Sequence, residues 1–157
     1  MLEAVFVVAE IGGVIRCNFL TATDCLKAGI QAIGGNIRAD SFNVNGNRRY
    51  GIYVERNGIL DGDGACTASN NGADGIRVDS GGVIRTFGVL NANNNVGAGL
   101  LVSQGTADIA PGSNLNYNAY GINTAAGSRV IIGSGSHISA NRQCGVEVFG
   151  MSYVDVQ

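Results

Sequence analysis

The chain has 157 residues, of which 45% are hydrophobic and only 14% are charged, with 25 glycines, one proline and no tryptophan. So much apolar surface with so few charges excludes a disordered linker, and the single proline excludes collagen. The formal net charge is −2, so the chain has no basic field for nucleic acid and we expect no nucleic acid partner. No apolar run approaches the ~20 residues that span a membrane, so we expect no membrane insertion.

The expected strands share a repeated opening, namely a glycine, a long or branched aliphatic residue, a variable residue and a small or apolar residue. In chain order these segments are Gly29–Ala32, Gly51–Val54, Gly75–Val78, Gly99–Val102, Gly121–Thr124 and Gly145–Val148, and Ala4–Val7 is a degenerate first copy. Successive glycines are 22, 24, 24, 22 and 24 residues apart. Apolar and polar side chains alternate within each segment, which is typical of half-buried strands.

Each repeat predicts two further short strands. The second strands are Gly13–Arg16, Gly35–Arg38, Gly58–Asp61, Gly82–Arg85 and Ser128–Ile131, and the third are Phe42–Val44, Cys66–Ala68, Leu90–Ala92, Leu115–Tyr117 and Ile138–Ala140. If the strands paired as hairpins, neighbours in sequence would be neighbours in space and a repeat of 22–24 residues would not be needed. We therefore expect every strand to stack on its equivalent 22–24 residues later. The prediction is an all-β solenoid, a parallel β-helix of about six coils with three short strands each. Leucines are too few for a leucine-rich repeat, and no six-residue subperiod indicates a left-handed helix.

Stacking converts the repeat into columns of equivalent residues. The core is predicted to contain Ile52, Ile76, Leu100, Ile122 and Val146 in one column and Val54, Val78, Val102, Thr124 and Val148 in the next. A third column, Asn47, Asn71, Asn95 and Asn141, lies four residues before the repeat glycines. These asparagines are expected either to hydrogen-bond from coil to coil as a ladder or to act as ordinary turn residues. Tyr117 stands at the same distance before Gly121, so the ladder is expected to be interrupted there.

The outward positions of the first strands supply the candidate site. Tyr53 and Glu55 on one strand are expected beside Arg77 and Asp79 on the next. Two carboxylates on adjacent coils are the minimum set of catalytic groups for glycoside hydrolysis. A tyrosine ring and a guanidinium are suited to the binding of sugars or acidic groups. Glu55 and Asp79 are therefore the candidate catalytic residues, and Tyr53 and Arg77 the candidate ligand-binding residues. The alternative is a solvated face on which Arg56 and Arg77 balance the carboxylates.

Neither a metal nor a cofactor is expected. The four cysteines, Cys17, Cys25, Cys66 and Cys144, lack a Cys-x-x-Cys or metal-binding spacing, and we interpret them as small buried hydrophobic residues. His137 is the only histidine and is expected on the surface, and the segment Asp61–Gly64 is a single copy of a calcium-turn-like sequence that functions only in tandem.

Coils that read Asn-x-x-x-Gly-Ile/Val-x-Val, then Gly-Ser or Gly-Gly, then a Val/Ile strand, resemble those of right-handed parallel β-helix proteins over roughly residues 4–156. Pectate lyases, polygalacturonases and bacteriophage tailspikes share this fold. The Gly-His-Gly segment of polygalacturonases has no counterpart, because His137 lies in Ser136-His137-Ile138, and no cluster of Arg, Lys and Asp matches a pectate lyase site. The irregular coils rich in Ser and Asn look most like part of a phage tailspike or tail fibre.

That resemblance implies a trimeric virion protein that binds host surface polysaccharide and, in many members, cleaves it. Three functions stay open: a host-recognition module, a polysaccharide hydrolase or lyase, and a structural shaft without a glycan site. An extracellular or cell-surface protein of bacterial origin is the alternative to a phage tail. Residues 1–157 are expected to form one domain of a longer chain, because Tyr153–Val156 stops without a cap and Phe6 and Val8 point outward. Such exposed apolar surface also predicts a homotrimer of parallel rods.

Overall fold

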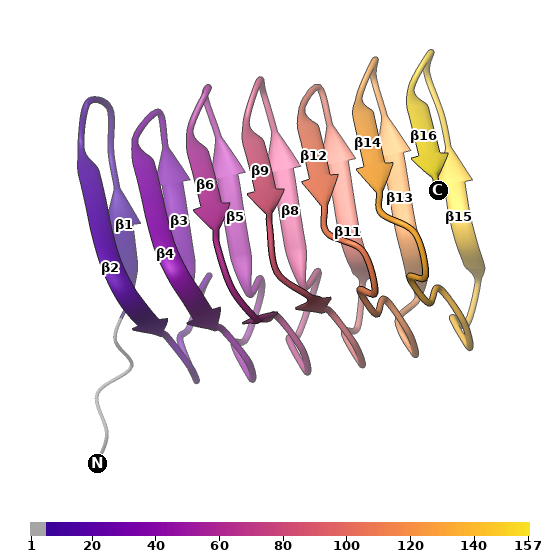
Figure 1. Ribbon diagram of the computed structural model, residues 1–157, viewed down its shortest axis with the longest axis horizontal. Coiled ribbons are helices and arrows are strands. Elements are labelled where there is room, and N and C mark those ends of the chain that lie inside the picture. Colours follow the sequence, from indigo (N-terminus) through magenta and orange to yellow (C-terminus); the bar gives the residue numbers. More distant parts are fainter. Residues whose placement is uncertain (1–5) are drawn as a thin grey trace.

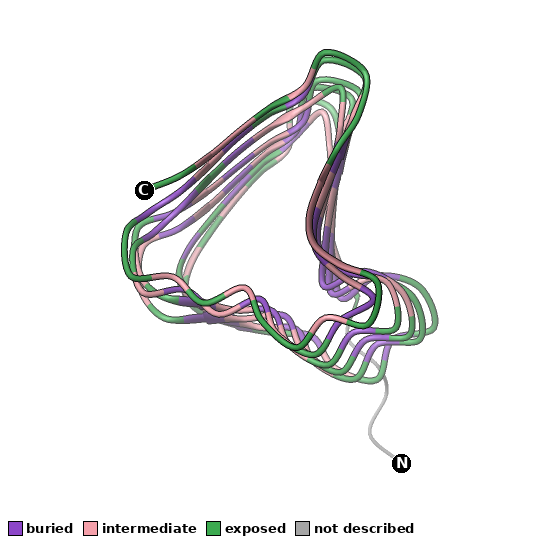
Figure 2. Cartoon of the chain, turned by 90° about the vertical axis from the view of Figure 1, so that its right-hand side faces the viewer, coloured by how far each residue is buried: buried purple, intermediate pink, exposed green. Residues whose placement is uncertain are grey.

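The computed structural model describes residues 6–157, and none of these residues is helical. The chain winds into a right-handed parallel β-helix of about seven coils (Figure 1). Figure 2 looks along the rod from its C-terminal end, where the cross-section is roughly triangular and the chain turns counter-clockwise as it approaches the viewer. The repeat period therefore predicts the fold class correctly, although the coil count is one higher than expected.

Two parallel sheets run along the rod: the first forms one side of the triangle, and the second forms another side and extends onto the third. The first sheet contains, in spatial order, β1 (Val7–Ala9), β3 (Ile30–Ile33), β5 (Ile52–Glu55), β8 (Ile76–Asp79), β11 (Ala98–Ser103), β13 (Tyr120–Ala125) and β15 (Cys144–Val148). The second contains β2 (Val14–Thr21), β4 (Asn36–Asn43), β6 (Ile59–Gly62), β7 (Cys66–Thr67), β9 (Val83–Thr86), β10 (Leu90–Asn91), β12 (Thr106–Ile109), β14 (Arg129–Ile132) and β16 (Tyr153–Val156). The additional coil begins with β1, and Ala4 and Val5 of the degenerate copy lie outside the described residues.

The third side of the triangle is less regular than predicted. In β4 the second and third predicted strands are continuous, since β4 pairs with β6 in its first half and with β7 at its end, and β2 runs beside β4 over the same length. After β10, this side keeps only isolated bridges from Asn91 to Asn114 and from Asn114 to His137. Within residues 6–157, three separate strands per coil are therefore found only in the coils β5–β7 and β8–β10. The pattern also misses β12, whose first inward residue is Ala107 instead of Val, Ile or Leu.

The predicted core columns are confirmed. Ile52, Ile76, Leu100 and Ile122 stack in register with no exposed surface, and Val54, Val78 and Val102 do the same beside them. In the last coil Val146 is only partly buried and Val148 is 46% exposed. Of the four cysteines that the sequence predicts to be buried, Cys25 and Cys66 are buried, whereas Cys17 and Cys144 are only half-buried.

A buried asparagine ladder runs along one corner of the rod. Asn47, Asn71 and Asn95 each donate from Nδ2 to the Oδ1 of the next member, at 3.2, 3.0 and 3.0 Å, and the series continues through Asn118 to Asn141. The predicted interruption at Tyr117 is wrong. Tyr117 has a φ of 60°, like Asn94 with 58° at the equivalent place one coil earlier, so the shortened turn begins only after Asn118.

Five of the six repeat glycines, all except Gly145, pack closely against this ladder. A Cβ atom at Gly51 would lie 2.6 Å from the carbonyl oxygen of Gly75 and 2.8 Å from Nδ2 of Asn71. Contacts that short do not occur for real side chains, so only glycine lets the backbone approach the ladder. The Gly-Ile-x-Val signature and the asparagine column are thus two parts of one packing arrangement.

Candidate functional site

All four predicted site residues lie on the outward face of the first sheet, on the neighbouring strands β5 and β8 (Figure 1). Tyr53 is the register partner of Arg77, and Glu55 and Asp79 follow two positions later on the same two strands. Because Val54 and Val78 between them point into the core, the alternation of the strands turns all four side chains to the surface. The structure therefore brings the predicted residues together.

Glu55 is held by several donors. The Tyr53 hydroxyl donates to its Oε2 at 3.2 Å, and Nε2 of Gln31 on β3 donates to its Oε1 at 3.4 Å. The Arg56 guanidinium adds a longer ion pair of 3.9 Å, and the Glu55 side chain is 17% exposed. Glu55 is thus a fixed acceptor that orients the Tyr53 side chain.

Asp79 has a separate partner. Arg77 Nε donates to its Oδ2 at 2.8 Å, and another nitrogen of the same guanidinium lies 3.8 Å from Oδ2 of Asp74. The Asp79 side chain is 15% exposed. The two candidate catalytic carboxylates are therefore each engaged by their own donors.

Tyr50 is the residue that the sequence reasoning missed. Its ring lies 5.4 Å from that of Tyr53 at an angle of 44°, and the guanidinium carbons of Arg49 and Arg77 lie 5.1 and 5.4 Å from its centre. Both arginines also donate to its hydroxyl, at 3.2 and 3.4 Å. Tyr50 directly precedes Gly51, so an alignment of the residue before each repeat glycine could have found it. We call Tyr50, Tyr53, Glu55, Arg77 and Asp79 the tyrosine patch.

A surface hollow of about 190 Å³ adjoins the tyrosine patch. It is lined by Lys27, Ala28, Gln31, Arg49, Tyr50 and Tyr53. Neither Glu55 nor Asp79 belongs to its wall. A ligand in the hollow would therefore meet two aromatic rings, two cationic side chains and one amide.

The electrostatics of the patch keep Tyr53 protonated. Partial burial, followed by the charges of Asp79 and Glu55, raises the pKa of its phenol from 10.0 to about 12. Burial also raises the pKa of the Asp74 carboxyl, opposed by the hydrogen bond from the Ala98 N–H and by the charge of Arg77. Tyr53 thus remains a hydrogen-bond donor throughout the physiological range of pH.

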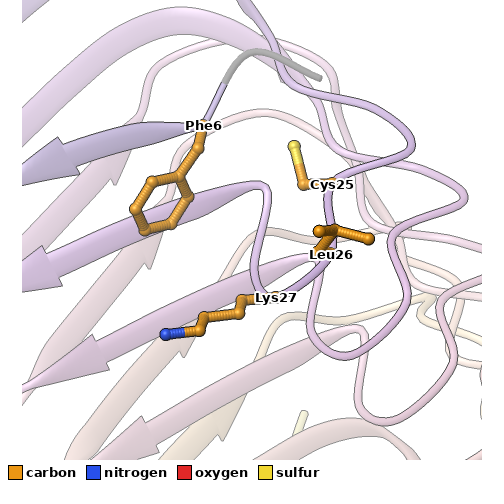
Figure 3. A pocket seen from close by; sticks show the side chains of 4 residues that line it. All are labelled: Phe6, Cys25, Leu26 and Lys27. Carbon is orange, nitrogen blue, oxygen red and sulfur yellow. The ribbon is translucent and has the colours of Figure 1, made fainter. Parts of the chain in front are cut away.

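A second hollow, of about 350 Å³, lies near the first coil (Figure 3). The described residues of its wall are Phe6, Cys25, Leu26 and Lys27, and the Lys27 side chain extends away from the Cys25 thiol. Burial and the charge of Asp24 raise the pKa of that thiol. This hollow is mostly apolar and offers Lys27 as the only charged side chain among the described residues of its wall.

Within residues 6–157, no three His, Cys, Asp or Glu side chains are arranged to hold a metal ion. None of these residues belongs to a helix long and apolar enough to cross a membrane. A scan against protein-family models finds no match, and searches of curated proteins and of solved structures find no similar chain.

Proposed function

We propose that this chain is a polysaccharide-recognition segment of an attachment protein, of the kind that forms phage tailspikes and tail fibres, and that the tyrosine patch and its hollow bind the glycan. Sugar rings stack on aromatic side chains through their C–H faces, and their hydroxyls exchange hydrogen bonds with amides, phenols and cations. The hollow beside Tyr50 and Tyr53 offers all of these groups, with Gln31, Lys27 and Arg49 around the rings.

One observation favours binding over hydrolysis: the two carboxylates are engaged with protein donors and lie outside the wall of the hollow. A general acid must reach the glycosidic oxygen of a bound substrate within hydrogen-bonding distance. Glu55 instead accepts hydrogen bonds from Tyr53 and Gln31, and Asp79 forms an ion pair with Arg77. These contacts support a role of both carboxylates in ordering the binding surface.

As part of this proposal, the chain belongs to a homotrimer in a virion, and an extracellular or cell-surface protein is the alternative setting. The resemblance of the coil pattern to phage tail proteins supports this assignment.

The test uses the purified chain with capsular polysaccharides and lipopolysaccharides in a binding assay, together with an assay for released reducing ends and unsaturated sugars. We expect binding without release, and Tyr50→Ala should weaken it by about 1–2 kcal/mol because a stacking platform is lost. Tyr117→Asn, which changes an exposed tyrosine on another side to the residue found one coil earlier, is the matched control.

Glu55→Gln separates a binding module from an enzyme. In a binding module the variant should reduce affinity modestly, by about 1–3 kcal/mol, since the amide keeps the shape but changes the hydrogen bonds of Tyr53. In an enzyme it should abolish sugar release while affinity stays the same. Binding and release that are both absent for the whole panel would identify a structural shaft instead.

A further inference from the structure

The third side of the rod carries two outward columns of small polar residues without Asp, Glu, Lys or Arg. The first column contains Thr21, Asn43, Thr67, Asn91, Asn114 and His137. The second, two residues further along each coil, contains Asn45, Ser69, Asn93, Asn116 and Ser139. The residues between the columns, such as Val44, Ala68, Ala92 and Leu115, are buried in the core, so the columns form one continuous surface.

Hydrogen bonds between coils fix the second column. The backbone N–H groups of Ser69, Asn93 and Asn116 donate to the side-chain oxygens of Asn45, Ser69 and Asn93, at 2.6, 3.0 and 2.8 Å. The Ser139 N–H extends the series to Oδ1 of Asn116, at 2.7 Å. The column is therefore rigid before any ligand binds.

These bonds also decide which way the amides face. A backbone N–H can only donate, so the atom it reaches on Asn93 or Asn116 must be the oxygen, and the amide nitrogen must occupy the other position. In the first column, Oδ1 of Asn91 accepts from Nδ2 of Asn114 at 2.9 Å. Among the residues that the structure describes, the Nδ2 atoms of Asn91, Asn93 and Asn116 donate to no protein acceptor, and all three residues are half-exposed. We call Asn91, Asn93 and Asn116 the amide array.

We propose that the amide array binds a neutral, extended polysaccharide chain that lies along the axis of the rod. Its free N–H groups can donate to acceptor oxygens, which sugar hydroxyls and ring oxygens supply. Asn91 and Asn93 lie on one coil and Asn116 on the next, ~4.8 Å further along the rod, so a sugar chain parallel to the axis meets free donors on two consecutive coils. The columns contain no Lys or Arg to select an acidic sugar and little exposed apolar surface to bury against a protein.

This inference extends the proposed function to a second face and rests on it only for the class of ligand. The array lies on the third side, whereas the tyrosine patch lies on the first sheet, so variants can address the two surfaces separately. The chain itself suggests the substitution, because Ser69 already replaces asparagine in the second column and still accepts the N–H of Asn93. Asn93→Ser with Asn116→Ser should thus keep the hydrogen bonds between coils and remove two free amide donors.

The experiment is affinity electrophoresis of the chain through gels that contain a linear β-glucan, a galactomannan or a dextran, with polygalacturonate as the acidic comparison. We expect retardation by at least one neutral polysaccharide, and an affinity about tenfold lower for the double variant. Asn94→Gly, which lies outside both the amide array and the tyrosine patch, should leave this retardation unchanged. Asn91→Thr, which introduces the residue that Thr67 provides at the same position of the preceding coil, is a second variant should the double variant not fold, and it should lower the affinity severalfold.

Two results would overturn the inference. One is that no neutral polysaccharide retards the wild-type chain. The other is retardation that persists in the folded double variant, or in Asn91→Thr, especially if Tyr50→Ala removes it. In that last case the tyrosine patch would bind the neutral glycan and the proposed function would stand without the amide array.

Discussion

Asn95 donates a hydrogen bond from Nδ2 to Oδ1 of Asn118 at 3.0 Å, although these residues are 23 positions apart and the preceding steps of the ladder span 24. The ladder therefore keeps its geometry while the connecting segment loses a residue. Coil register is specified by the side-chain network together with the inward apolar columns, and the turns adjust their length to it.

Asn95→Ala should destabilise the protein by more than about 3 kcal/mol. The Asn95 side chain accepts from both the backbone N–H and Nδ2 of Asn71, and donates to Ala68 O and Asn118 Oδ1, all in a fully buried position. Each buried group left without a partner costs about 1–3 kcal/mol. Urea unfolding measures the loss.

The neighbouring residue gives the control for the ladder. Asn94 is exposed with a φ of 58°, so Asn94→Gly should be neutral or stabilising by less than about 1 kcal/mol. Equal destabilisation by both substitutions would show that the turn as a whole, and not the buried amide, stabilises this corner.

Val78→Asp should cost several kcal/mol and abolish cooperative folding. Val78 has no exposed surface and stacks between Val54 and Val102, so an aspartate there would be a buried carboxylate without a partner. Circular dichroism during thermal unfolding measures the effect. A soluble Val78→Asp protein with a sharp transition would contradict the inward position of this residue.

Tyr53 should ionise at a pH about two units higher than an ordinary tyrosine. Its pKa in the folded protein is raised to about 12 by burial and by Asp79 and Glu55, against an ordinary value of 10.0. The protonated phenol therefore contributes stability that is fully present below pH 10 and is lost as the pH rises through about 12. Absorbance at 295 nm follows the titration.

Tyr53→Phe provides the comparison, because it should remove only the late part of that titration curve and leave the other tyrosines unchanged. If the late part is instead still present in the variant, the raised pKa belongs to another tyrosine and the geometry of the patch is not what sets it.

The last coil should associate with other copies in a homotrimer. Val148, Phe149, Met151 and Tyr153 are 46%, 54%, 99% and 56% exposed, which leaves a contiguous apolar segment uncovered in the single chain. Multi-angle light scattering at micromolar concentration should give three times the chain mass, and Phe149→Ser with Met151→Ser should shift the population to monomers. A stable wild-type monomer would remove this support for a phage tail protein.

The fold could be predicted because the period of the sequence equals the length of one coil. This period predicts the repeat glycines and the core valines. It also predicts the outward positions of Tyr53, Glu55, Arg77 and Asp79. What the period could not predict was where a coil loses a residue. The coil from Gly99 to Gly121 loses one residue between Asn95 and Asn118 and a second between Asn118 and Gly121, so counting four residues back from Gly121 places Tyr117 in the ladder instead of Asn118.

The site was predictable only in part, for a similar reason. Strand alternation places Tyr53 and Arg77 on one face, but Tyr50 belongs to a turn, where side-chain direction does not follow period two. The partners of Glu55 and Asp79 depend on rotamers, which position along the chain does not determine. The amide array was missed because its donors become apparent only when the acceptor of each backbone N–H is known.

Each coil is a translated copy of its neighbour, so one complete coil is a unit that can be removed from or added to the gene without changing the register of the others. Excision of residues 71–94 would join Asn70 to Asn95. Because Asn95 is the equivalent of Asn71 one coil later, the junction would keep the Asn-Asn pair and would bring Asn47 directly under Asn95. Leu101 and Ser103 would then replace Arg77 and Asp79 beside Tyr53 and Glu55. Recombination in units of one coil can therefore exchange the side chains on the outer surface while the interior scaffold stays the same.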